Sequence, residues 1–120
     1  MRIAPLCVAI AAALALVGCR SPYIATAIVN RTGQPLSVLE LDYPSASFGA
    51  DSLAPDATYR YRFQVLGNGP TTLLWTDSAH HDHKVTGPSL REGDVGSLTI
   101  TLTPGSAPAW DLRLANRPAN

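Results

Sequence analysis

Regular alternation of apolar and polar residues, interrupted by frequent turn signals, is the feature that most restricts the fold of this chain. In residues 97–103, Leu98, Ile100 and Leu102 alternate with Ser or Thr, and residues 59–65 show the same alternation with Tyr and Phe. An apolar residue at every second position is typical of a strand that buries one face. Ten prolines and nine glycines lie mostly between such segments and argue against long helices.

The same pattern divides the chain into seven or eight short strands. They are expected at residues 24–30, 36–43, 45–53, 59–65, 71–76, 83–86, 97–103 and 110–114. Asn68-Gly69 between two of these segments is typical of a β-hairpin. Small polar residues and Gly49 weaken residues 45–53, which are therefore expected at a sheet edge. The sequence predicts an all-β fold, a two-sheet antiparallel sandwich over residues 24–115, with residues 116–120 as a frayed tail.

Residues 1–18 have the composition of a secretory leader. One positive residue, Arg2, precedes an uncharged apolar stretch at residues 3–17. As a helix this stretch would be about 22 Å long, which is short of the ~30 Å hydrocarbon core of a bilayer. The leader is therefore predicted to be a helical signal peptide that is cleaved rather than a permanent membrane span.

The apolar stretch ends in Leu16-Val17-Gly18-Cys19, which resembles the lipobox of bacterial lipoproteins. In that family a diacylglyceryl group is attached to the cysteine thiol, the chain is cleaved before the cysteine, and the new amine is acylated. The resemblance implies cleavage between Gly18 and Cys19, a lipid on Cys19, and a short tether at residues 19–23. Two or more acyl chains hold a protein stably on a bilayer. Arg20, in place of an acidic residue, implies the periplasmic face of the outer membrane.

Two segments of the mature region resemble known envelope proteins. The turn at residues 53–57 (Leu-Ala-Pro-Asp-Ala) before an aromatic strand is similar to immunoglobulin-like envelope modules. Asp42-Tyr43-Pro44 followed by Phe48-Gly49 is similar to small, uncharacterised bacterial lipoproteins. The resemblance implies an immunoglobulin-like sandwich and carries no known activity.

Charge and cysteine content exclude some partners and some sources of stability. The chain has nine Lys or Arg and nine Asp or Glu; removal of Arg2 with the leader leaves eight against nine, a net charge near −1. No basic patch for nucleic acid is expected. Cys7 leaves with the leader and Cys19 would carry lipid, so the mature domain would have no disulfide and would depend on packing.

All three histidines fall in His80-His81-Asp82-His83. Imidazole and carboxylate groups are ordinary ligands for Zn²⁺ or Cu²⁺. In an extended segment His81 and His83 share a face, and a third ligand would have to come from Asp77 or a neighbouring loop. The alternative is a solvated hairpin tip, because a metal site needs three or four oriented ligands with supporting contacts.

Charged residues and aromatic residues give two further candidate surfaces. Arg60 and Arg62 are expected to face outward on one strand, and Glu40 and Asp42 on another. If these strands pair, they form a cross-strand charge ladder; the alternative is a face that binds an anion. Four aromatic residues are expected either in the core or in an exposed patch that contacts glycan or protein. They are Tyr23, Tyr43, Phe48 and Trp75.

No sequence motif for catalysis is present: the chain lacks Gly-x-Ser-x-Gly, His-Glu-x-x-His, a Walker loop and Gly-x-Gly-x-x-Gly. We therefore interpret it as a non-enzymatic, lipid-anchored protein of the bacterial cell envelope. It would act through contact with another envelope protein, with residues 45–53 as the candidate edge strand. The alternative is a periplasmic metal-binding or metal-delivery lipoprotein that uses His80, His81 and His83. A small hydrolase is a third alternative.

Overall fold

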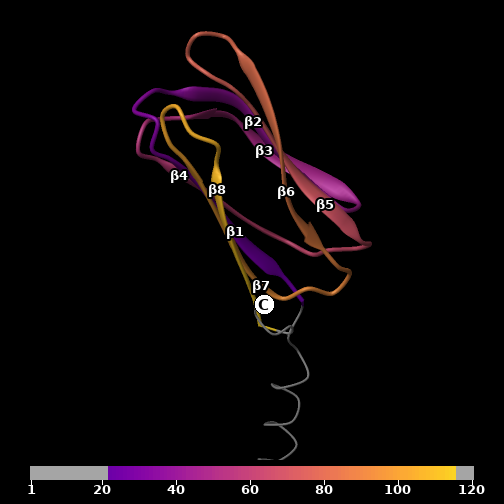
Figure 1. Cartoon of the computed structure of the whole chain (residues 1–120). Coiled ribbons are helices and arrows are strands. Elements are labelled where there is room, and N and C mark those ends of the chain that lie inside the picture. Colours follow the sequence, from indigo (N-terminus) through magenta and orange to yellow (C-terminus); the bar gives the residue numbers. More distant parts are fainter. Residues whose placement is uncertain (1–21, 116–120) are drawn as a thin grey trace, which may run out of the picture.

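The computed structural model describes residues 22–115, which form a sandwich of two four-stranded β-sheets (Figure 1). The prediction of an all-β, two-sheet sandwich is confirmed. Within residues 22–115 no helix is long and apolar enough to cross a membrane. The expected signal peptide, the lipid site at Cys19 and the tail at residues 116–120 lie outside the described residues.

Eight strands make up the two sheets. They are β1 (Ile24–Asn30), β2 (Leu36–Tyr43), β3 (Ala46–Leu53), β4 (Thr58–Phe63), β5 (Gly69–Thr76), β6 (Asp82–Leu90), β7 (Gly96–Leu102) and β8 (Ala109–Leu114). The main difference from the expected boundaries is β6, which was expected at residues 83–86 and continues to Leu90. Pro88 is tolerated there because β6 is an edge strand, where a missing N–H breaks no inner ladder.

The strand order is β4-β1-β7-β8 in one sheet and β3-β2-β5-β6 in the other. β1 and β7 are parallel, whereas all other neighbours are antiparallel, so the sandwich is mostly rather than wholly antiparallel. In immunoglobulin constant domains the first strand lies beside the second, but here β1 and β2 belong to different sheets. The likeness to immunoglobulin modules is therefore one of architecture and not of strand order.

The core consists of the inward-facing residues of both sheets. Leu98, Ile100 and Leu102 of β7 are buried, as the alternation predicted, and they pack with Leu41 of β2 and Leu73 of β5 in one cluster. Each large apolar side chain contributes about 1.5–3 kcal/mol on burial. Burial of these two inner faces is thus what holds the sheets together.

An aromatic cluster closes the side of the sandwich where β3 and β4 are the sheet edges. Phe48 lies 4.3 Å from Tyr61 between ring centroids, and Tyr43 lies 4.0 Å from Phe63. Tyr61 remains 43% exposed because β4 has no neighbouring strand on its outer side. The alternation in this strand therefore predicts its inner face correctly but overstates the burial of Tyr61.

Two pairing predictions are wrong because they depend on which sheet each strand joins. Asn68-Gly69 does not close a hairpin: it links β4 of one sheet to β5 of the other. The charge ladder between Arg60 and Glu40 does not form either, because β4 and β2 lie in different sheets. Glu40 instead lies near Asp42 on its own strand, and this second carboxylate raises the pKa of Glu40 through a hydrogen bond and charge repulsion.

Candidate functional site

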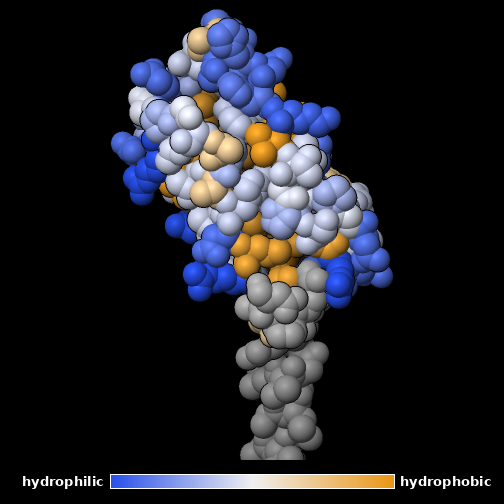
Figure 2. Space-filling view, in the orientation of Figure 1, coloured by the Kyte–Doolittle hydropathy of each residue, from blue (hydrophilic) through white to orange (hydrophobic). Residues whose placement is uncertain are grey.

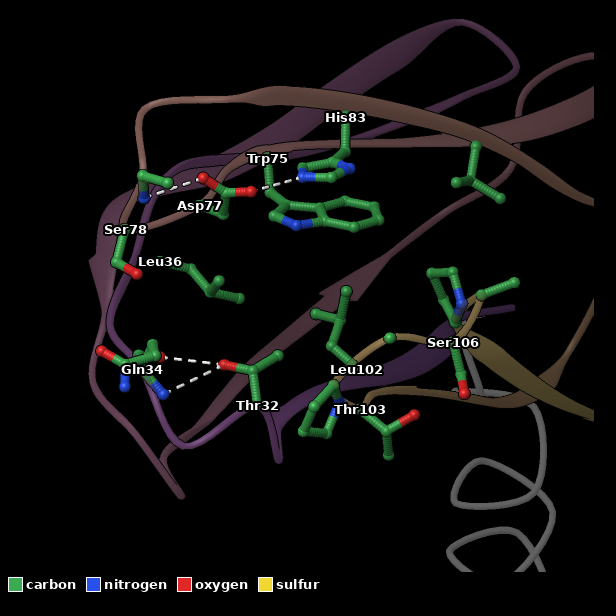
Figure 3. Close-up of a pocket in the computed structure, with 16 residues that line it drawn as sticks. Thr32, Gln34, Leu36, Trp75, Asp77, Ser78, His83, Leu102, Thr103 and Ser106 are labelled. Carbon is green, nitrogen blue, oxygen red and sulfur yellow. Dashed lines mark hydrogen bonds and ion pairs between the residues drawn. The ribbon is translucent and has the colours of Figure 1, made fainter.

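A pocket of about 430 Å³ opens between the two sheets at one end of the sandwich (Figure 3). Three connections surround it: residues 31–35 between β1 and β2, residues 77–81 between β5 and β6, and residues 103–108 between β7 and β8. Its volume falls within the range of about 300–1,000 Å³ typical of ligand pockets. These connections lie at the top of Figure 1, whereas β1 begins at the bottom. We call this cavity the distal pocket.

The walls of the distal pocket are apolar because the ends of four strands supply inward-facing side chains. Leu36, Trp75, Val85 and Leu102 line it from β2, β5, β6 and β7. Residues 103–108 contain two prolines, which cannot donate to a strand ladder, so β7 and β8 are joined by an irregular connection over the pocket. Polar residues line the pocket from the surrounding connections. They are Thr32, Gln34, Asp77, Ser78, Thr103 and Ser106.

Trp75 and His83 form a stacked pair on one side of the distal pocket. They are register partners on β5 and β6, and their ring centroids are 4.8 Å apart with an interplanar angle of 10°. Figure 3 shows the indole with His83 on one side and the pocket, with Leu102 across it, on the other. The face of Trp75 that is turned toward the pocket is therefore an apolar wall held in place by His83.

The Asp77 carboxylate organises the turn above this pair. Its Oδ2 accepts a hydrogen bond of 2.8 Å from His83 Nε2, and its Oδ1 accepts from the backbone N–H groups of Ala79 and His81 at 2.9 and 3.0 Å. The bond from His83, followed by that from the His81 backbone, lowers the pKa of Asp77 to about 2. Asp77 is therefore ionised above acidic pH and fixes the position of the His83 ring.

The depressed pKa of Asp77 predicts a specific acid sensitivity. The folded-state pKa of Asp77 is about 2, against an ordinary value of 3.8. The ionised carboxylate therefore stabilises the folded state above pH 3.8, and this contribution is lost as the pH falls toward 2. We expect Asp77→Asn to lower Tm at neutral pH, and the Tm difference from wild type to shrink through this range. Thermal unfolding followed by circular dichroism as a function of pH measures this. A Tm difference that stays constant through this pH range would contradict the assignment.

The residues of the predicted metal cluster take different positions. His83 is bonded to Asp77 and stacked on Trp75, while the Oδ1 atom of Asp82 accepts a 2.7 Å hydrogen bond from the Thr76 hydroxyl. His81 Nδ1 lies 3.8 Å from Asp77 Oδ2, so the expected third ligand does lie beside two of the histidines. His80 is exposed and adopts a positive φ of 64° in the turn. Within residues 22–115 no group of three or more His, Cys, Asp or Glu residues could hold a metal ion, and the metal site stays a prediction.

The other predicted surfaces divide between two sides of the molecule. Tyr43 and Phe48 belong to the aromatic cluster of β3 and β4, and Trp75 lines the distal pocket, so the aromatic residues do not form one patch. β3 is an edge strand, as predicted. One of its carbonyl groups, that of Gly49, already accepts a 3.1 Å hydrogen bond from the Tyr59 hydroxyl.

Asn30 supports the distal pocket and was not identified from the sequence. It is fully buried, and its Nδ2 atom donates to the carbonyl groups of Gln34, Leu53 and Ala54 at 2.8, 3.1 and 3.1 Å. Its Oδ1 atom accepts from both the backbone N–H and the hydroxyl of Thr32. It therefore ties the β1–β2 connection, which lines the pocket, to the β3–β4 turn. An Asn at a strand end followed two residues later by Thr is the turn signal that could have revealed it.

No protein-family profile matches the sequence, and no curated protein sequence matches it. Among solved structures, the chain is similar to a protein from Eubacterium rectale determined by NMR. The TM-score is 0.58 at 5% sequence identity, over 82% of this chain and 94% of that chain. At this level of identity the likeness shows the fold alone.

Proposed function

We propose that this chain is a lipid-anchored protein of the bacterial cell envelope that acts by binding, and that it holds an apolar group of a partner protein in the distal pocket. The observation that carries the proposal is the position of this pocket. It opens at the end of the sandwich opposite to residue 22, where β1 is about to begin, and Cys19 precedes residue 22 by three positions (Figure 1). A lipid on Cys19 would therefore join the domain at the end farthest from the pocket.

The chemistry of the distal pocket supports binding rather than catalysis. Its best candidate for acid–base chemistry, the pair of Asp77 and His83, is engaged in holding the turn and the Trp75 ring. The Thr32 hydroxyl is likewise hydrogen-bonded to Asn30. A bound group would therefore contact mainly the apolar walls of the pocket. A buried apolar side chain in such a pocket is the usual centre of a protein–protein contact.

Site-specific photocrosslinking in intact cells tests this proposal. We expect a photoreactive residue at Ser106, on the pocket rim, to give a discrete adduct, and one at Ser47, on the exposed edge of β3, to give none. Ala107→Trp, in the exposed part of the β7–β8 connection, should block the pocket and remove the Ser106 adduct without changing Tm. An adduct that forms at Ser47 but not at Ser106, or that survives Ala107→Trp, would contradict binding in the distal pocket. The first of these results would point to pairing at the edge of β3.

A further inference from the structure

The end of the sandwich opposite to the distal pocket is built from four strand termini. Ile24 at the start of β1 pairs with Phe63 at the end of β4 and with Gly96 at the start of β7, and Gly96 pairs with Leu114 at the end of β8. Residue 22 lies next to these termini, so the segment that carries the predicted lipid site joins the domain here. We call this the proximal end.

Cationic side chains gather at the proximal end although the described domain is acidic. Residues 22–115 contain six Lys or Arg and nine Asp or Glu, a net charge of 6 − 9 = −3. Three of the six cations are exposed at this end: Arg62 and Arg113 lie one residue before the ends of β4 and β8, and Arg91 begins the connection from β6 to β7. Glu92, Asp94 and Asp111 lie beside these arginines, so the charges at this end balance and the rest of the described domain carries the net charge of −3. Asp94 is buried, so the exposed groups at this end are three arginines and two carboxylates.

Two of the exposed large apolar side chains lie among these arginines. Leu66 is 56% exposed and Tyr23 is 36% exposed, and the Arg62 guanidinium lies 4.8 Å from the centre of the Tyr23 ring. Figure 2 shows hydrophobic residues at this end with hydrophilic residues on both sides. The segment that carries Leu66 is fixed, because Gly93 N–H donates to the Val65 carbonyl at 3.1 Å. Leu66 is thus held outward by the fold.

We infer that the proximal end docks on the surface of an anionic phospholipid bilayer, with Leu66 and Tyr23 at the interface and Arg62, Arg91 and Arg113 against the lipid phosphates. This inference rests on the proposed function, because the lipid on Cys19 is what brings the bilayer to this end. The five residue-to-residue steps from Cys19 to Ile24 span at most about 17 Å, so the domain cannot move far from the surface. Aromatic rings and basic side chains are the groups that favour this interface.

Docking of the proximal end would also determine how the domain is oriented on the membrane. A single flexible tether allows a domain to tilt in any direction, whereas a basic and apolar contact beside the tether holds the long axis of the sandwich away from the bilayer. The distal pocket would then point toward the opposite side of the compartment. The basic residues thus determine the orientation of the domain, while the acyl chains supply the affinity for the membrane.

The test uses the mature lipidated protein in phosphatidylcholine vesicles with and without phosphatidylglycerol. Leu66→Cys, and Val38→Cys as the matched exposed apolar control, are each labelled with a polarity-sensitive fluorophore; Cys19 is blocked by its lipid and Cys7 has been removed. We expect a blue shift of the Leu66 label only with phosphatidylglycerol, its reversal by high salt, and no shift of the Val38 label. The triple variant with Arg62→Gln, Arg91→Gln and Arg113→Gln should abolish the blue shift of the Leu66 label.

Flotation with the vesicles separates the two proposals. Protein that floats with both vesicle types but shows the same Leu66 emission in each would overturn docking and leave the anchor intact. A blue shift that survives the triple arginine replacement, or one found on Val38, would also overturn docking at this end. Protein that carries no lipid and does not float with phosphatidylcholine vesicles would instead contradict the proposed anchor.

Discussion

Replacement of Asn30 by Ala is expected to lower the free energy of unfolding by about 3 kcal/mol, because it leaves buried partners without a hydrogen bond. The Asn30 side chain donates to three carbonyl groups and accepts from Thr32, and it is fully buried. Chemical denaturation monitored by Trp fluorescence measures the change.

The matched control for this prediction is Thr32→Ser, which retains the hydroxyl that bonds to Asn30. It should change the free energy of unfolding far less than Asn30→Ala does. Because the β1–β2 connection lines the distal pocket, Asn30→Ala should also weaken the crosslink from Ser106. A variant at Asn30 that unfolds at the same denaturant concentration as wild type would show that this residue does not hold the two turns together.

Cys19→Ser is expected to abolish lipid attachment and cleavage before residue 19. A serine hydroxyl does not replace the thiol in this modification, so the variant should retain its leader and incorporate no labelled palmitate. Cys7→Ser is the matched control, because Cys7 lies inside the leader and would be removed with it; we expect normal processing and labelling. Gel mobility and metabolic labelling in a bacterial host measure both. Labelling of Cys19→Ser equal to that of wild type would place the lipid elsewhere.

Local alternation was sufficient to predict most of the strands. The expected and observed ranges agree for Ile24–Asn30 and Leu36–Tyr43, where apolar residues recur on one face between clear turn residues. Leu98, Ile100 and Leu102 are buried as expected. These features depend on residues close together in the chain, so one sequence was enough to determine them.

The assignment of strands to sheets could not be predicted in this way. Asn68-Gly69 carries a strong hairpin signal, but whether β4 and β5 pair depends on β1, about forty residues upstream, which takes β4 as its neighbour. The parallel pairing of β1 with β7 has no local signal either. Both follow from which apolar faces the two sheets bury together.

The distal pocket could not be predicted from the sequence either, because three separate connections and the ends of four strands come together to form it. Sequence reasoning did single out Trp75 as an aromatic candidate and His83 as a possible metal ligand. The structure gives them a shared position instead, stacked at 4.8 Å with Asp77 holding the imidazole. The contacts of His83 in the structure are thus a hydrogen bond and a ring stack, and its role as a metal ligand stays a prediction.

The central claim is that lipid at Cys19 holds one end of this sandwich at a membrane while the pocket at the other end is free to bind. The most direct test is mass spectrometry of the N-terminal peptide from protein purified out of the membrane fraction. The claim predicts a peptide that begins at residue 19 and carries the added mass of a diacylglyceryl group and an amide-linked acyl chain. A peptide with unmodified Cys19, or one that still contains residues 1–18, would contradict it.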